Sequence, residues 1–175
     1  CGLQPSGGRA LILGAGGAAA GCAGALAEAG VEEILLLNRT PQRTQDLIAR
    51  MRAAFPQTTW RYGVSDPAAP CAAVPPAERF HLVVNCIPEE PASRLGPILE
   101  AVRRDGSVLC DMSYSDGPTA LMETARDNGY AVVPGLEVLL WQGVYAFEIM
   151  TGIAAPAKVM RDAITAVVGD WWLKC

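Results

Sequence analysis

The stretch that decides the fold is residues 9–43, RALILGAGGAAAGCAGALAEAGVEEILLLNRTPQR. Residues 9–13 are a short apolar run typical of a buried strand, and a glycine-rich turn follows directly. Residues 17–29 are rich in Ala, contain no proline and precede Gly30, which is favoured just beyond a helix end. Residues 34–37 form a second apolar run. The order strand, glycine turn, helix, strand predicts a βαβ unit with two parallel strands.

The glycine turn fits the pattern G-x-G-x-x-G/A, with Gly14, Gly16 and Ala19 at its three fixed positions. In this pattern the first glycine allows a tight turn and the second lets the backbone approach a pyrophosphate. The third, small residue lets the helix pack on the strand. The following helix N-terminus offers unpaired N–H groups to phosphates. Between two strands, the turn predicts dinucleotide binding; the alternative is a glycine turn with a purely structural role.

The residues after the second strand indicate which dinucleotide is bound. A unit that binds NAD usually carries Asp or Glu about 20 residues beyond the turn, to bond the ribose 2′-OH. Asn38, Arg39 and Thr40 hold that place here, and Arg43 follows one helical turn later. Guanidinium groups and a hydroxyl bind a 2′-phosphate, which a carboxylate would repel, so the sequence predicts NADP. In the alternative, Thr40 only caps a helix that begins at Pro41, and both arginines are solvated; the two interpretations are compatible.

The rest of the chain continues this alternation. We expect strands at residues 58–62, 81–85, 107–111 and 130–133, and helices at 41–54, 95–103, 119–128, 138–151 and from about 156 to 169. Residues 66–78, rich in Ala and Pro, predict a surface loop or a short irregular crossover. The pattern is that of an α/β, Rossmann-like, doubly wound parallel sheet of about six strands in the order 3-2-1-4-5-6. Residues 1–175 would form one domain. Strand ends carry Gly14, Arg39, Asn85, Asp111 and Gly135, which predicts one continuous groove.

Composition excludes several functions. The net charge is -4 and no Lys/Arg cluster exists, which argues against nucleic acid as a direct partner. The longest apolar run is far shorter than the roughly 18 residues of a membrane span. The six cysteines lack metal-binding spacing, so we expect reduced thiols, no metal site and a cytoplasmic chain. The single histidine, His81, opens a strand, where we expect a packed core residue rather than an acid–base group.

Five blocks of the sequence resemble the C-terminal, NADP-binding domain of the shikimate dehydrogenase family. They are GAGGA at 14–18, NRTPQR at 38–43, VVNCIP at 83–88, DMSY at 111–114 and GLEVLLWQGVYAFEIMTG at 135–152. The resemblance covers roughly residues 9–165. The last block is most similar to eukaryotic fused versions, such as the fungal multifunctional aromatic-pathway polypeptide, and to a related fungal quinate-pathway repressor.

The resemblance implies a role for particular residues. The residues implied in binding NADP are Gly14, Gly16, Gly17, Ala18, Asn38, Arg39, Thr40, Arg43, Asn85 and Gly135, the last by letting the nicotinamide approach. Tyr114 and Gln142 match positions that touch the hydroxy-acid substrate; without the family, they are an ordinary tyrosine at a strand end and a helical glutamine. Ala20, Ile87 and Val138 depart from the family's usual Arg, Thr and Met. These departures predict weak NADP binding.

The resemblance also implies that a Lys and an Asp of an N-terminal domain perform proton transfer. The two lysines of this sequence, Lys158 and Lys174, both lie near its C-terminal end. We therefore assign no catalytic residue, and expect that the N-terminal catalytic domain is absent and that the chain does not catalyse alone. The first hypothesis is the coenzyme domain of an enzyme of aromatic amino acid biosynthesis that interconverts 3-dehydroshikimate and shikimate, or acts on quinate. Its small-molecule substrate would be shared with the missing domain.

Two other hypotheses stay open. The chain is alternatively a non-catalytic domain of a quinate-pathway transcriptional repressor that senses metabolite or cofactor, in which case it would be nuclear. The third alternative is a structural domain whose groove is unused.

Overall fold

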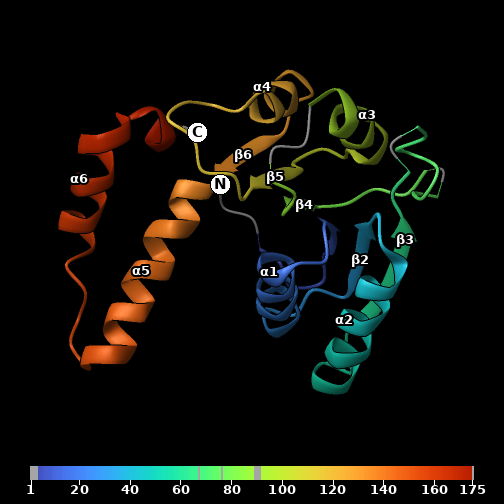
Figure 1. The fold of residues 1–175 in the computed structure, drawn as a ribbon, viewed down its shortest axis with the longest axis horizontal. Coiled ribbons are helices and arrows are strands. Elements are labelled where there is room, and N and C mark those ends of the chain that lie inside the picture. Colours follow the sequence, from blue (N-terminus) through green and yellow to red (C-terminus); the bar gives the residue numbers. More distant parts are fainter. Residues whose placement is uncertain (1–3, 67, 76, 89–91, 175) are drawn as a thin grey trace.

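Six parallel strands form the centre of the structure (Figure 1). The structure is a computed structural model that describes residues 4–66, 68–75, 77–88 and 92–174. The strands are β1 (Arg9–Leu13), β2 (Glu33–Asn38), β3 (Thr59–Val64), β4 (Leu82–Asn85), β5 (Val108–Asp111) and β6 (Ala131–Pro134). They are arranged in the order β3-β2-β1-β4-β5-β6, and every neighbouring pair is parallel. This order confirms the predicted Rossmann-like, doubly wound sheet.

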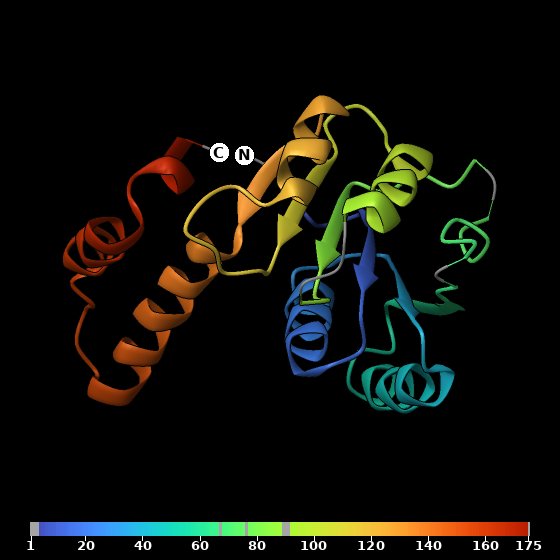
Figure 2. The ribbon, with the colours of Figure 1, turned by 45° about the horizontal axis from the view of Figure 1, so that its top comes forward.

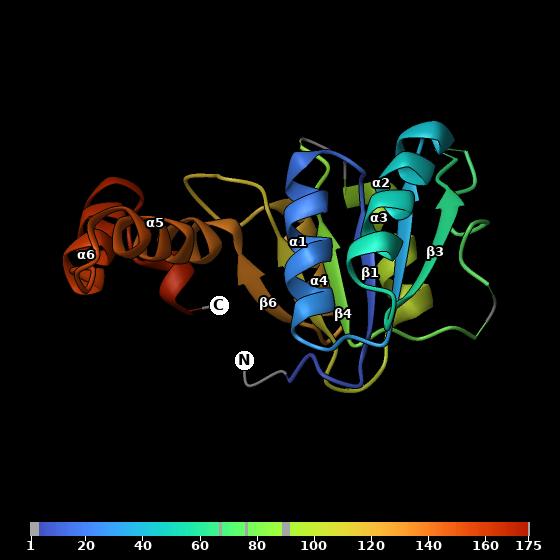
Figure 3. The same ribbon diagram turned by 90° about the horizontal axis from the view of Figure 1, so that it is seen from below.

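Four helices cover the two faces of the sheet. The helices of the chain are α1 (Gly17–Glu28), α2 (Pro41–Ala54), α3 (Ala92–Val102), α4 (Ala120–Asp127), α5 (Gly135–Thr151) and α6 (Ala157–Val168), followed by the 3₁₀ helix η1 (Trp171–Lys174). Helices α1 and α2 lie on one face and α3 and α4 on the other (Figure 3). Helix α5 begins at residue 135 rather than at the predicted 138, directly after β6. The crossover from β3 to β4 contains turns and no helix among its described residues, as predicted.

Successive side chains of each strand point to opposite faces of the sheet, so a hydrophobic core forms on each face. Leu11 and Leu13 of β1 pack toward α3 and α4, whereas Ala10 and Ile12 pack toward α1 and α2. Both sets are almost completely buried because a parallel sheet is covered on both faces. Helix α1 contributes alanines four residues apart, whose small side chains let the helix lie close to the sheet: Ala19, Ala23 and Ala27.

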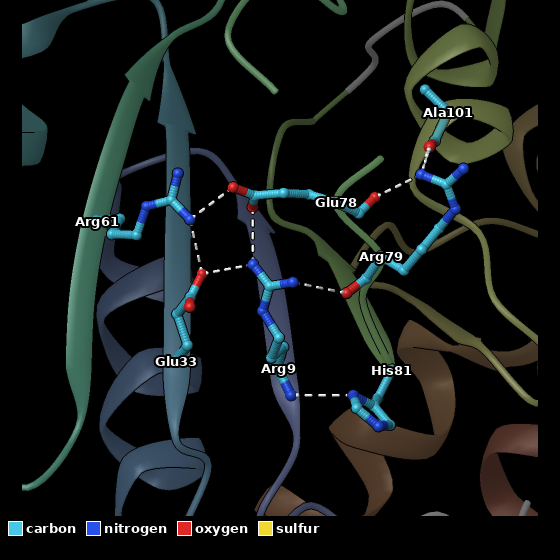
Figure 4. Close-up of polar contacts among 7 residues, drawn as sticks. All are labelled: Arg9, Glu33, Arg61, Glu78, Arg79, His81 and Ala101. Carbon is cyan, nitrogen blue, oxygen red and sulfur yellow. Dashed lines mark hydrogen bonds and ion pairs between the residues drawn. The ribbon is translucent and has the colours of Figure 1, made fainter. Parts of the chain in front are cut away.

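An ion network closes the edge of the sheet where β1 and β2 begin (Figure 4). Arg9 contacts Glu33 Oε1 and Glu78 Oε2, each at 2.7 Å, and Arg61 contacts the same two carboxylates at 2.9 and 2.8 Å. The network joins the end of the β3–β4 crossover to the three strands β1, β2 and β3. His81 is at the same edge, where its Nδ1 accepts a 3.0 Å hydrogen bond from the backbone N–H of Arg9. The histidine is half-buried and hydrogen-bonded at this edge, so the expectation of a packed core residue is wrong.

Helices α5 and α6 form an antiparallel pair beside the edge strand β6 (Figures 1 and 2). A separate apolar cluster holds this pair together: Leu136, Leu140 and Val144 of α5 lie with Trp172 of η1, and Met160 and Ile164 of α6 pack against them. In the described part of the chain, no helix is long and apolar enough to cross a membrane.

Candidate dinucleotide-binding groove

The turn between β1 and α1 requires glycine at its first position for two reasons. Gly14 has φ +110°, a backbone conformation that residues other than glycine rarely adopt. A Cβ atom on Gly14 would also lie 3.3 Å from the carbonyl oxygen of Cys86, which follows β4. The Gly14 N–H donates a 2.8 Å hydrogen bond to the carbonyl of Leu37 in β2. The turn is thus fixed against both neighbouring strands.

The start of α1 faces open space. Gly16 occupies the N-cap position, and no side chain caps this end of the helix. A Cβ atom on Gly16 or Gly17 would meet nothing within 4 Å, and both glycines and Ala18 are exposed. The N–H groups of the first helical turn have no partner within the helix, so they are free to bind an anion. The residues present fit a pyrophosphate at this position.

Three neighbouring hollows follow the carboxyl-terminal edge of the sheet. The first, of about 410 Å³, is lined by Ala18, Asn85, Cys86, Ile87, Pro88, Met112, Ser113 and Tyr114. The second, of about 430 Å³, shares Ala18 and Met112 with the first and reaches Val138 and Gln142 on α5. The third is small, about 20 Å³; it shares Ile87 with the first and reaches Arg39 after β2. The three hollows follow one line from α5 to the end of β2, along the edge of the sheet where ligands bind in such folds.

The end of this path near β2 carries the donors that the sequence predicts for a 2′-phosphate. Thr40 is at the N-cap of α2 with Pro41 at N1, but its hydroxyl makes no capping hydrogen bond. Arg39 and Arg43 are exposed at the same helix end. The Asn38 amide donates a 3.0 Å hydrogen bond to the carbonyl of Thr40, which shapes the loop. Thr40 therefore occupies the N-cap position of α2, as the alternative interpretation expects, but its hydroxyl does not cap the helix.

Other residues at this end were not predicted. Ser65, Asp66 and Arg94 line the third hollow together with Arg39. Asp66 accepts a 2.8 Å hydrogen bond from the backbone N–H of Ala68 through Oδ1. Ser65 and Asp66 directly follow β3, and this position at a strand end could have identified them from the sequence as groove residues. Arg94 lies on α3, and no local pattern distinguishes it from a solvated helical arginine.

A buried polar network forms the wall of the first hollow. Asn85 and Asp111, at the ends of β4 and β5, are 3% and 1% exposed. The Asn85 amide donates a 2.9 Å hydrogen bond to Asp111 Oδ1, and Thr119 donates a 2.7 Å hydrogen bond to Asp111 Oδ2. Thr119 in turn caps α4 by accepting the N–H of Met122 at 3.1 Å. Asn85 borders the groove, but its amide is held by protein partners.

The structure brings Tyr114 and Gln142 to the same part of the groove. Tyr114 lines the first hollow and Gln142 the second, and these hollows meet at Ala18 and Met112. Gly135, in contrast, is buried and lines neither hollow. A Cβ atom there would lie 2.6 Å from the carbonyl oxygen of Ser113. Close packing of the segment after β5 therefore requires a glycine at 135 independently of any ligand, and the role toward nicotinamide stays a prediction.

The glycine turn, the open helix terminus and the line of hollows define a dinucleotide-binding α/β domain. Two family models match the chain: "Shikimate / quinate 5-dehydrogenase" at residues 4–59 and "Shikimate 5'-dehydrogenase C-terminal domain" at residues 135–165. A shikimate dehydrogenase (NADP(+)) of Moorella thermoacetica is 36% identical over 170 residues, which are 96% of this chain and 56% of the relative. The chain belongs to the shikimate dehydrogenase family.

Solved structures agree with this assignment. A shikimate 5-dehydrogenase from Mycobacterium fortuitum has a TM-score of 0.71 and 29% identity over 90% of this chain and 56% of its own. The S. pombe structure of a dehydroquinate dehydratase and shikimate dehydrogenase has a TM-score of 0.73 and 27% identity over 93% of this chain and 31% of its own. This chain thus spans little more than half of the Moorella relative. The Moorella relative is bacterial and a further relative, from Methanothermobacter thermautotrophicus, is archaeal, so the predicted eukaryotic fused origin stays a prediction.

Proposed function

We propose that this chain is the NADP-binding part of a shikimate dehydrogenase-like protein whose parent reaction interconverts 3-dehydroshikimate and shikimate. The observation that carries the proposal is the groove that joins the open start of α1 to Arg39 after β2. The exposed guanidinium groups of Arg39 and Arg43 favour a 2′-phosphate over a ribose hydroxyl. The relatives that match the chain carry NADP(+) in their names.

Within this proposal, each part of the groove has its own task. The backbone at Gly14, Gly16, Gly17 and Ala18 holds the pyrophosphate, and Asn38 to Arg43 hold the adenosine 2′-phosphate. The nicotinamide end lies toward the second hollow, near Gly135. The bound cofactor supplies the hydride chemistry, while Tyr114 and Gln142 orient the hydroxy acid from this side. Ile87 and Val138 also line the groove, so their departures from the family pattern support the expected weaker binding.

The chain is not catalytic alone in this proposal. Both lysines are on the α6 side of the molecule and are paired, Lys158 with Asp162 at 2.6 Å and Lys174 with Asp170 at 2.7 Å. The buried carboxylate behind the wall of the first hollow, Asp111, is occupied by hydrogen bonds. Proton transfer to the substrate oxygen needs an acid–base group within hydrogen-bond reach. That group comes from the part of the parent protein outside this chain.

The outer face of α5 and α6 is the surface that this remaining part covers. Ile149 and Met150 are each 84% exposed, and Tyr145, Ile153 and Val159 are more than half exposed. Several exposed large apolar side chains on one helix pair and its connecting loop favour an interface there. The helix pair begins at the nicotinamide end of the groove, so a domain docked there would reach the substrate.

Titration with NADPH and NADH tests the proposal. We expect NADPH to bind with a dissociation constant in the micromolar range and NADH to bind much more weakly. Arg39→Ala should weaken NADPH binding at least about tenfold, because a charged hydrogen bond contributes about 1.5–3 kcal/mol, and should leave NADH binding unchanged. Arg50→Ala, also exposed on α2 but near its far end, is the matched control and should bind like the parent chain. No binding of either nucleotide at millimolar concentration would overturn the cofactor assignment.

A regulatory domain is the second candidate function. The departures at Ala20, Ile87 and Val138 favour it, because a sensor tolerates loss of cofactor affinity better than an enzyme does. In that case the parent is a quinate-pathway repressor acting in the nucleus, rather than a cytoplasmic enzyme. Dehydrogenase assays on the complete parent protein distinguish the two, since only an enzyme turns over shikimate or quinate with NADP.

A further inference from the structure

The third hollow is lined by two arginines that come from different elements of the fold. Arg39 follows β2, and Arg94 lies in the first turn of α3. Ser65 and Asp66, which follow β3, complete its polar lining. Three parts of the chain thus bring two positive charges and one negative charge to one small space. Neither Arg94 nor Asp66 belongs to the sequence blocks that resemble the family.

Hydrogen bonds of the backbone hold the Asp66 side of the hollow in place. The N–H of Ser65 donates a 3.1 Å hydrogen bond to the carbonyl of Asn38, so the chain after β3 is tied to the loop that carries Arg39. The Asp66 carboxylate accepts the N–H of Ala68 at 2.8 Å through Oδ1, which orients it within a turn. The carboxylate is therefore held at the end of the groove where the 2′-phosphate is expected.

Helix α3 holds Arg94 at the other side of the same hollow. Leu95 and Ile98 of this helix also line the hollow, and they are only 3% and 0% exposed because they belong to the core between α3 and the sheet. The helix cannot move away from the hollow without opening this core. Arg94 itself is half-buried, and its five N–H donors allow it to bind a phosphate alongside a protein partner.

A phosphate group matches the size and the charges of this hollow. The volume of about 20 Å³ admits a water-sized group and no purine ring. A phosphate monoester carries close to two negative charges at neutral pH and presents three acceptor oxygens. Arginine binds such oxygens in pairs through its planar fork, so a second arginine raises the affinity for a phosphate and does little for a ribose hydroxyl.

We propose that Arg94 is a second arginine for the adenosine 2′-phosphate, together with Arg39, and that the Asp66 carboxylate opposes the same phosphate. The balance of these charges sets how strongly the chain prefers NADP to NAD. This inference rests on the proposed NADP function and adds two residues that determine its specificity. Because only one of the two cofactors carries the phosphate, both residues act on NADPH binding alone, and they act with opposite signs.

Titration of the full chain with two matched pairs of ligands tests the proposal. The pairs are NADPH with NADH, and 2′,5′-ADP with 5′-AMP, which differ only in the 2′-phosphate. Arg94→Ala should weaken NADPH and 2′,5′-ADP binding at least about tenfold, the effect of one charged hydrogen bond. Asp66→Asn keeps an oxygen that can accept the turn hydrogen bond, and should strengthen both about two- to fivefold, as expected for one exposed charge. Binding of NADH and 5′-AMP should not change.

Two control variants remove the same charges elsewhere. Arg103 and Asp105 lie beyond the far end of α3, at the opposite edge of the sheet, so Arg103→Ala and Asp105→Asn should bind all four ligands like the parent. Arg94→Lys keeps the charge without the fork, and its NADPH affinity should fall between those of the parent and Arg94→Ala. Thermal unfolding verifies that each variant is folded, and Arg94→Gln replaces Arg94→Ala if that variant is not.

The outcomes separate this proposal from the proposed function. If Arg39→Ala weakens NADPH binding but Arg94→Ala or Asp66→Asn binds like the parent, the proposal is overturned and the proposed function stands. Equal changes in NADPH and NADH binding would reveal a structural role or a contact with the shared adenosine, and would also overturn it. If the parent chain binds neither nucleotide, the proposed function fails and the roles of Arg94 and Asp66 fail with it.

Discussion

Asn85 and Asp111 share a 2.9 Å hydrogen bond across the ends of the adjacent strands β4 and β5, where both side chains are almost fully buried. Asp111 also accepts the backbone N–H of Ser113 at 3.2 Å and the hydroxyl of Thr119 at 2.7 Å. One carboxylate therefore joins a groove residue, the segment that leads to Tyr114 and the cap of α4. The groove wall depends on this carboxylate.

Asp111→Ala should lower the free energy of unfolding by about 2–3 kcal/mol, because it leaves several buried donors without an acceptor. Asp111→Asn keeps one acceptor oxygen and should cost less than half as much. Urea denaturation measures both, with Asp116→Ala, an exposed aspartate of the next loop, as the control. Equal losses for Asp111→Ala and the control would show that the network does not stabilise the wall.

Alanine substitutions at two glycines should have opposite effects: one should lower the stability of the chain, and the other should weaken NADPH binding. Gly135→Ala places a Cβ 2.6 Å from the Ser113 carbonyl oxygen, so it should destabilise the chain by about 1–3 kcal/mol through overpacking. Gly17→Ala meets no atom within 4 Å and should leave stability unchanged or slightly raised, since alanine favours a helix by up to about 1 kcal/mol. Its methyl group projects where the pyrophosphate is expected, so NADPH binding should weaken. Thermal melts and NADPH titrations of both variants measure this; a reversal of the two effects contradicts the geometry.

The ion network should contribute to the acid sensitivity of the chain. Burial alone would raise the pKa of Glu33, but hydrogen bonds and charges from Arg9 and Arg61 outweigh it and hold the pKa below its usual value. A carboxyl with a depressed folded-state pKa stabilises the fold above its unfolded-state pKa, and this contribution is lost as the pH falls through the folded-state value. Glu33→Gln should therefore flatten the acid side of the stability–pH curve. Glu32→Gln, the exposed neighbour, should leave the curve unchanged; matching curves for the two variants would refute the assignment.

The apolar face of α5 should matter for association rather than for folding. Ile149→Ser with Met150→Ser should change the unfolding free energy of the chain by less than about 1 kcal/mol, because both side chains are already in water. The same pair should weaken binding to the remaining part of the parent protein supplied as a separate chain, measured by calorimetry. Val64→Ser, an exposed apolar residue on β3, is the control. Unchanged association of the double variant would exclude this face as the interface.

The fold was predictable because its signals are local. The apolar runs, the glycine turn and the proline at the start of α2 each act within a few residues, and strand order follows from the handedness of βαβ units. The same holds for the donors at 38–43, which follow a strand directly. The start of α5 was placed late because Gly135 resembles a loop residue, whereas the packing of Ser113 makes glycine compatible with the helix start.

The sequence by itself therefore determined the sheet, the turn and the type of ligand that the turn favours, since these depend on periodicity and on residue types close together in the chain. Only the tertiary structure decided which residues come together: Arg9 with Glu78 in an ion pair, and Tyr114 and Gln142 in adjoining hollows of one groove. Such contacts join residues from about 30 to 70 positions apart. Their partners are set by how helices and strands pack, and local sequence patterns carry no record of that packing.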